Sequence, residues 1–366
     1  MSDLRPVARL PILLLGMLSL FGGALAGLAR LDWTVPAIAA SAAGNHGALM
    51  ISAFFGTVIS LERAVALGQR CAYLAPATAG VGGVALLAGA PLALAQALAV
   101  GAAIVMVAAN VQVLRRLFAP FTVVLAIGAL CWLIGNLTWF VSDSVHMAVP
   151  WRLAFLILTI AGERLELSRF LPTPPTARRV FHVVVATIIA GALLSHWESH
   201  IGLTVFAGGL LALSLWLLRF DIAWRNVRLN GLPRFIAVCL LAGYVWLALA
   251  GLFGLAGGFE PVHPLRDSTL HAVGLGFVFS MVFGHAPIIF PAVARIKIPY
   301  HSAFYLPLLL LHLSLLLRVA GGVSGMFALR SDGGLANACA LLLFIATILV
   351  SVYRGRNMQH RAKRPR

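Results

Sequence analysis

Four histidines of this chain fall inside or at the start of long apolar stretches, where an ionisable side chain is costly. The chain has 11 histidines, and the other seven lie in polar connections, at helix ends or in the basic tail, where we expect them to be solvated. An imidazole within a membrane segment usually faces the bundle interior and serves a metal, a haem or a proton path. The residues concerned are His46, His271, His285 and His312.

Two of these histidines are candidate ligands of a b-type haem. His46 opens the stretch NHGALMISAFFGTVISLER, and His271 opens DSTLHAVGLGFVFSMVFGHAPIIFPAV. Both helices are expected to run in the same direction across the membrane, which places the two imidazoles at similar depth. A haem needs two neutral imidazoles on opposite faces of its plane, next to small residues that let the macrocycle approach. In the alternative interpretation, both are interfacial histidines bonded to loop carbonyls.

The second pair of histidines offers a further metal site or a proton path. His285 follows His271 by fourteen residues, which returns it to within about 40° of the same helix face and about 21 Å further along the axis. His312 lies near the middle of the next apolar segment. Pro287 and Pro291 leave backbone carbonyls unpaired, as in a lined cavity. In the alternative interpretation, each of these histidines is a buried side chain that forms hydrogen bonds within the protein and binds no metal.

Carboxylates and arginines cluster where two of the apolar segments end. Glu62 and Arg63 end one segment, and Glu163, Arg164 and Glu166 end another. Adjacent residues of a helix do not face each other, so pairs within one segment are not expected. Pairing between the two helices is the favoured interpretation, and proton uptake is the alternative.

The elements that must position these residues are membrane helices. Hydrophobic residues make up 61% of the 366 residues and charged residues 10%, and the mean hydropathy is +0.97, which a soluble domain cannot bury. The apolar stretches are continuous and not alternating, which favours helices over a barrel. They predict an all-α, polytopic bundle of about twelve spans at 8–29, 44–66, 72–90, 92–114, 119–141, 150–170, 180–195, 202–219, 234–254, 268–292, 302–320 and 334–353.

The whole chain, 1–366, is expected to form one membrane domain. The linker RFLPTPPTARR is the longest polar connection, and it divides the chain into six-helix halves at approximately 1–171 and 179–366. Residues 1–29 could alternatively be a signal peptide. The four cysteines show no CxxCH spacing for covalent haem attachment.

The net charge of +16 is explained by topology and does not point to nucleic acid. With both termini inside, all 27 basic residues except five fall in inner segments, as the positive-inside rule requires. The exceptions are Arg30, Arg152, Arg266, Arg318 and Arg330. The pattern predicts a multi-pass protein of a bacterial-type inner membrane, whose partner is the bilayer.

Histidines on the second and tenth of twelve helices resemble the haem ligands of the haem-copper oxidase catalytic subunit. The stretch HGALMISAFFG is similar to the second-helix signature of that family, and LHAVGLGFVFSMVFGHAPIIFPA is similar to the histidine helix of NnrS-type haem and copper membrane proteins linked to nitric oxide stress. The oxidase copper site needs histidines in spans six and seven, where the chain has only His182. The resemblance therefore implies haem binding and not oxygen reduction.

The expected function is that of an NnrS-like membrane protein. It would hold haem b between His46 and His271, with a second haem or copper at His285 and His312. It would handle electrons from a quinol or a cytochrome, or a diatomic ligand such as nitric oxide. Two other classes fit the sequence: a proton-coupled secondary transporter, and a structural subunit of a respiratory complex.

Overall fold

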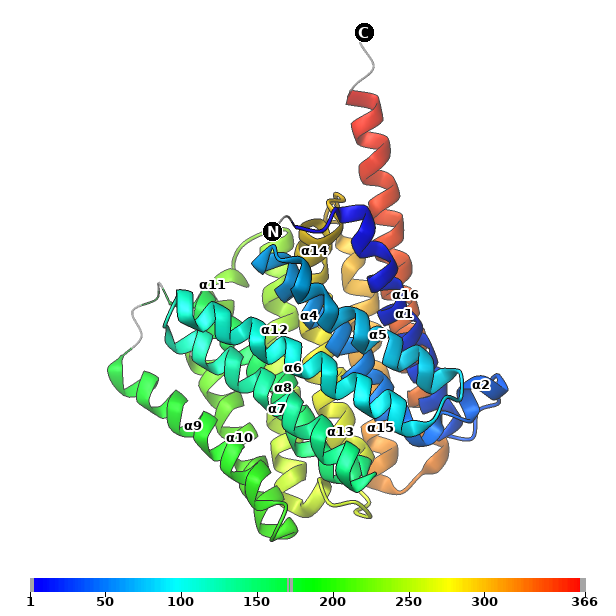
Figure 1. Ribbon diagram of the computed structural model, residues 1–366, viewed down its shortest axis with the longest axis vertical. Helices are drawn as coiled ribbons and strands as arrows, with labels where there is room; N and C mark the ends of the chain where they lie inside the picture. The colour runs from blue at the N-terminus through cyan, green and yellow to red at the C-terminus, as the bar shows by residue number, and fades with distance from the viewer. Residues whose placement is uncertain (1–2, 170, 172–173, 363–366) are drawn as a thin grey trace. The chain divides into compact units, whose positions relative to one another are not determined.

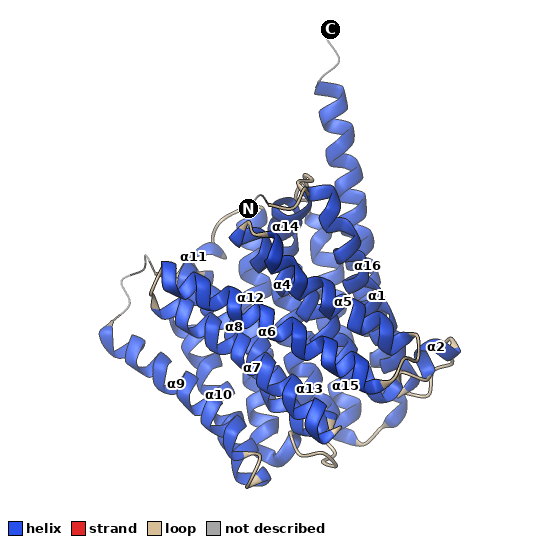
Figure 2. Ribbon diagram, in the orientation of Figure 1, coloured by secondary structure: helices blue, strands red, loops and turns tan. Residues whose placement is uncertain are grey.

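The computed structural model describes residues 3–169, 171 and 174–362, with residues 356–362 described by their backbone, and in this part of the chain the regular elements are helices (Figure 2). Twelve helical segments here are long and apolar enough to cross a bilayer. They are Pro6–Ala29, Ala43–Leu67, Arg70–Leu87, Leu92–Arg116, Pro120–Ser142, Val145–Leu167, Pro175–Leu194, Ser199–Phe220, Leu232–Gly258, Arg266–Ala294, Ser302–Ser324 and Phe327–Gly355. The prediction of an all-α, twelve-span bundle is confirmed, and the protein is a multi-pass membrane protein.

The chain divides into two compact units, Met1–Gly209 and Leu210–Arg366, and the boundary falls inside helix α10 (Ser199–Phe220). The sequence placed a division earlier, at the linker after the sixth span. The difference has a local cause, because the preceding helix α9 (Pro175–Leu194) packs directly on the start of α10. A Cβ atom on Gly191 would lie 2.3 Å from the backbone nitrogen of Phe206, so the two backbones are in contact.

Unit 1 contains the first seven spans and the start of the eighth (Figure 1). Several of its helices begin at proline, whose fixed φ suits the first turn, and α4 ends at Gly68 in the left-handed conformation. Its remaining elements are α1 (Pro6–Ala29), α2 (Ala37–Ala40), η1 (Ala43–Asn45), α3 (His46–Ala48), η2 (Leu49–Phe55), α4 (Gly56–Leu67), η3 (Arg70–Tyr73), α5 (Leu74–Leu87), α6 (Leu92–Arg116), α7 (Pro120–Ser142) and α8 (Val145–Leu167).

Helices α7 and α8 are held together by small residues. A Cβ atom on Gly128 would lie 3.3 Å from the backbone nitrogen of Thr159, which shows how closely the helices approach. One turn along, the rings of Trp132 and Phe155 stack with their centroids 5.1 Å apart. Apolar burial does not drive helices together within lipid, so this close contact supplies the attraction.

Unit 2 contains the end of α10 and the last four spans (Figure 1). A Cβ atom on Gly333 would lie 2.5 Å from the backbone nitrogen of Arg318, so its last two helices also approach through glycine. Its other elements are α11 (Ala223–Asn226), α12 (Leu232–Phe253), η4 (Gly254–Gly258), α13 (Arg266–His271), η5 (Ala272–Phe279), α14 (Ser280–Ala294), η6 (Ser302–Phe304), α15 (Tyr305–Ser324) and α16 (Phe327–Ala362).

Candidate haem-binding histidines

Three of the four membrane histidines have their Nδ1 atom bonded to a backbone carbonyl. The distances are 2.6 Å from His46 to the oxygen of Gly23, 2.8 Å from His271 to Asp267, and 2.7 Å from His285 to Met281. A carbonyl oxygen only accepts, so Nδ1 carries the proton, and the lone pair of each neutral ring is on Nε2. This is the tautomer of histidines that bind iron or another metal through Nε2.

His46 is positioned by the first helix of the chain. Its ring lies on the surface of α1 at Gly27, where a Cβ atom would be 2.8 Å from the imidazole Cε1 atom. Together with the bond to Gly23, this contact sets both the position and the tautomer of the ring. Glycines in the middle of a helix weaken it, and here they make room for the imidazole.

A π-helical segment follows each of the two predicted haem ligands. The segment η2 begins three residues after His46, and η5 begins directly after His271. The sequence pattern of an ordinary α-helix does not explain why either segment is π-helical. A π-helical turn widens the helix and re-aims the side chains beside it, and such turns occur often at functional sites.

His271 also has a carboxylate partner. Its Nδ1 atom lies 3.3 Å from Oδ1 of Asp267 as well as near the carbonyl oxygen of that residue. Arg318 of α15 donates to both carboxylate oxygens, at 2.8 and 2.7 Å. The result is a chain of guanidinium, carboxylate and imidazole, in which the carboxylate orients the ring.

Sequence analysis missed Asp267 and Arg318 as members of this site. Asp267 precedes His271 by four residues, which places the two on one helix face, and that spacing was a usable signal. Arg318 was counted only as an outer basic residue. It is 51 residues away from Asp267, and its pairing had no local signal.

His312 is arranged differently from the other three. The indole nitrogen of Trp246 donates to its Nδ1 atom at 3.0 Å, and the two rings stack at an angle of 12°. The neutral ring therefore carries its proton on Nε2, which is buried and has no hydrogen-bond partner among the described residues. In this state His312 presents an N–H donor, whereas a metal ligand needs a lone pair on that nitrogen.

Unit 1 also buries a guanidinium that sequence analysis did not select. Arg152 is 1% exposed, and its Nη2 atom donates to Oδ1 of Asn136 at 3.3 Å. Ser52 donates to the same oxygen at 2.7 Å, and the Arg152 guanidinium carbon lies 4.5 Å from the ring centroid of Trp139. Its Nε and Nη1 atoms have no hydrogen-bond partner in the described part of the chain. A buried cation with two unused N–H groups is a natural partner for a carboxylate.

The carboxylates predicted near the C-terminal ends of α4 and α8 lie close enough to interact electrostatically. Glu163 of α8 interacts with Glu62 and Arg63 of α4, and with its own neighbours Arg164 and Glu166. Glu166 forms an exposed ion pair with Arg169 at 3.9 Å. The structure thus brings the predicted residues of the two helices together. Pairing between the helices and proton uptake both stay predictions.

The sequence of the chain matches the model of the family described as a domain of unknown function, DUF8744, over residues 9–353. The chain belongs to this family. Among curated proteins, none matches it. The matched range contains every predicted site residue, so the histidines and the inner carboxylates are part of the DUF8744 domain.

Proposed function

We propose that this DUF8744 protein binds haem b through His46 and His271 and uses it to transfer electrons or to bind a diatomic ligand such as nitric oxide. The observation that carries the proposal is the hydrogen bond from each Nδ1 atom to a backbone carbonyl. Both rings are held as the tautomer that ligates iron through Nε2. Bound haem would supply a one-electron couple or, with an open coordination position, a site for the gas.

Arg152 of unit 1 also suits the binding of haem. Haem carries two carboxylates, and the unused N–H groups of Arg152 suit a carboxylate. Hydrogen bonds connect Arg152 through Asn136 to Ser52, which lies six residues after His46 on the same span. Arg152, Asn136 and Ser52 thus form one hydrogen-bonded group, which reaches the span that carries His46.

His285 and His312 have separate roles in this proposal. His285 shares the tautomer of His46 and His271 and is the candidate for a second haem or a copper ion. The described residues contain no group of three or more His, Cys, Asp and Glu side chains that could hold a metal ion. We assign His312 as an N–H donor toward a ligand, because Trp246 occupies its Nδ1 atom.

The test is an optical spectrum of the detergent-purified protein, reduced minus oxidised, with a pyridine haemochrome assay. We expect a b-type spectrum with haem close to stoichiometric. His46→Ala and His271→Ala should each lose the haem, and His146→Ala, at an exposed position of α8, is the matched control. Equal haem content in all three variants, or a folded protein without haem, would refute the proposal.

A second function has one observation in its favour. Glu62 and Glu163 gather two carboxylates near the ends of α4 and α8, as in a proton-coupled transporter. In that case Glu163→Gln would abolish proton uptake by proteoliposomes in the presence of a transported solute. Haem content unchanged by this variant, together with uptake that requires Glu163, would favour the transporter.

A further inference from the structure

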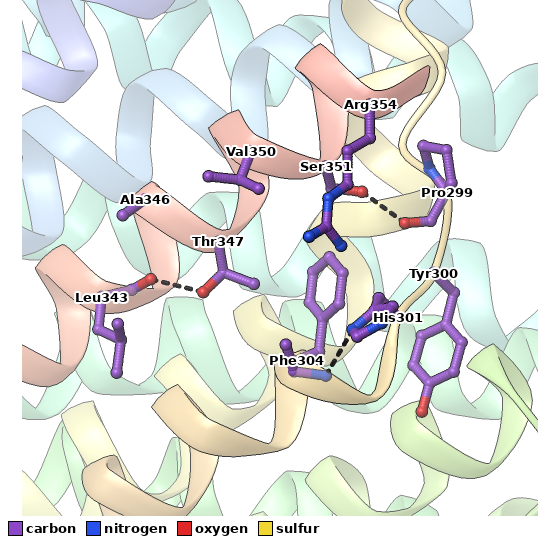
Figure 3. Close-up of a pocket in the computed structure, with 11 residues that line it drawn as sticks. Pro299, Tyr300, His301, Phe304, Leu343, Ala346, Thr347, Val350, Ser351 and Arg354 are labelled. Atoms are coloured by element: carbon purple, nitrogen blue, oxygen red, sulfur yellow. Dashed lines mark hydrogen bonds between the residues drawn. The ribbon is translucent and has the colours of Figure 1, made fainter. Parts of the chain in front are cut away.

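A groove of about 730 Å³ lies in unit 2 between the last helix and the segment that precedes α15 (Figure 3). It is separate from the histidines described above. The side chains that line it are those of Pro299, Tyr300, His301, Ala303, Phe304, Leu343, Ala346, Thr347, Val350, Ser351 and Arg354.

One wall of the groove is an apolar stripe on α16. Leu343, Ala346 and Val350 are spaced by three and four residues, so they lie on one helix face, and all three are exposed. Arg354 continues the same face one turn further along. The stripe from Leu343 to Arg354 is about 16 Å long, which matches the roughly 15 Å depth of one bilayer leaflet.

The end of the groove carries positive charge and hydrogen-bond donors. Arg354 is exposed and has neither an ion pair nor a side-chain hydrogen bond to the described residues, and Figure 3 shows its guanidinium directed toward the Phe304 ring. His301 accepts the backbone N–H of Ala303 at its Nδ1 atom, so its Nε2 atom carries the proton and can donate. The described residues of the lining include no carboxylate, which favours an anion over a cation.

The lining contains three hydroxyl groups, of which the two on α16, those of Thr347 and Ser351, are used within the protein; the third belongs to Tyr300. Ser351 donates to the carbonyl oxygen of Pro299, and Thr347 donates to that of Leu343, as the dashed lines in Figure 3 show. Their donor capacity is spent, so the stripe between Arg354 and Leu343 presents mainly apolar surface to a ligand. An acyl chain fits that surface, and a polar solute does not.

We propose that this groove binds one anionic phospholipid, with its phosphate at Arg354 and His301 and an acyl chain along Leu343, Ala346 and Val350. The charge distribution of the sequence assigns this end of α16 to the inner face of the membrane, where anionic headgroups attract basic side chains. The proposal does not depend on haem.

The experiment is native mass spectrometry of the full chain reconstituted in vesicles of equal phosphatidylglycerol and phosphatidylcholine. We expect the wild type to retain one phosphatidylglycerol in preference to phosphatidylcholine. Arg354→Gln should weaken that preference about fivefold, the effect of one basic side chain near a charged surface. Ala346→Trp, at an exposed position, should fill the stripe and reduce the retained lipid by a similar factor.

Arg116→Gln is the matched control, because Arg116 is an exposed arginine at the end of α6 in the other unit. It removes the same charge and should leave the preference unchanged. Equal retention of the two lipids by the wild type, or equal effects of the two arginine variants, would overturn the proposal. The proposal would also be overturned if an organic extract of the wild type contained a quinone that is absent from the Ala346→Trp variant, since the groove would then bind a neutral ring.

Discussion

His46 in unit 1 and His271 in unit 2 have the same tautomer, but different parts of the chain impose it. A distant helix positions His46, through the carbonyl of Gly23 and the surface at Gly27. His271 depends on its own helix, through the carbonyl and the carboxylate of Asp267. The position of the His46 ring is therefore sensitive to helix packing, and that of the His271 ring to charge.

The two units also differ in how a charged side chain is paired. In unit 2 the carboxylate of Asp267 is neutralised by Arg318. In unit 1 the buried guanidinium of Arg152 has no carboxylate within 4.0 Å among the described residues. In the proposed function, the carboxylates of haem would supply a partner for this guanidinium.

The largest effect is expected for Asp267→Asn. The amide keeps the size of the side chain, but it removes the charge that orients His271 and pairs with Arg318. Loss of such an outer partner typically lowers metal affinity about 10- to 100-fold, so haem affinity should fall by a similar factor. Titration of the apoprotein with haem measures this.

Arg318→Lys separates the charge of Arg318 from the geometry of its contact with Asp267. It keeps the positive charge and loses the two-pronged contact, so its effect on haem affinity should be smaller than that of Asp267→Asn. Wild-type affinity in Asp267→Asn would show that the carbonyl bond alone positions His271.

Arg152→Met tests whether the buried guanidinium of Arg152 pairs with a carboxylate of the proposed haem. A buried cation without a partner is unfavourable, so its replacement should raise the free energy of unfolding of the haem-free protein by about 1–4 kcal/mol. The same variant should bind haem more weakly, because the carboxylate partner is lost. Thermal unfolding of both forms in detergent would reveal these opposite signs, and effects of equal sign would contradict the assignment.

Gly27→Ala should displace the His46 ring and so weaken the binding of the haem proposed between His46 and His271. The new methyl group would lie 2.8 Å from the ring Cε1 atom, and such overpacking costs about 1–3 kcal/mol. Gly274→Ala is the control, since a Cβ atom there has no other atom within 4 Å. Haem content and the low-spin electron paramagnetic resonance signal distinguish the two variants, and identical behaviour would argue against this packing role.

The smallest effect is expected for Trp246→Phe. It removes the indole donor to His312 and a small volume of buried ring, which should lower the free energy of unfolding by about 1 kcal/mol. Affinity for the haem proposed at His46 and His271 should not change. A denaturation series read by circular dichroism, with haem titration in parallel, checks both statements.

The spans could be predicted from the sequence because their signal is local. Each depends on about 20 apolar residues and on nearby breakers, such as Pro120 before α7 and Gly68 after α4. The contacts of His271 and His285 with carbonyls four residues earlier also follow from helix geometry once the helix is known.

The long-range contacts had no comparable signal. The bond from His46 to Gly23 joins residues 23 apart, and the one from Trp246 to His312 joins residues 66 apart. The burial of Arg152 was missed because the residue lies near a span end, where an exposed arginine is the ordinary expectation. The π-helical segments η2 and η5 have no clear sequence pattern either.

The sequence alone established that this protein is a helical membrane protein with twelve spans, and which ionisable residues lie within them, because hydropathy depends on neighbouring residues. The exact helix ends were not predicted: the sixth and twelfth spans begin at Val145 and Phe327, where the sequence predicted 150 and 334. Only the tertiary structure decided which ring nitrogen of His46 and His312 carries the proton, that Asp267 pairs with Arg318, and that Arg152 is buried without a carboxylate partner among the described residues. Those properties depend on hydrogen bonds between segments far apart in the chain, and such bonds exist only when the helices are packed.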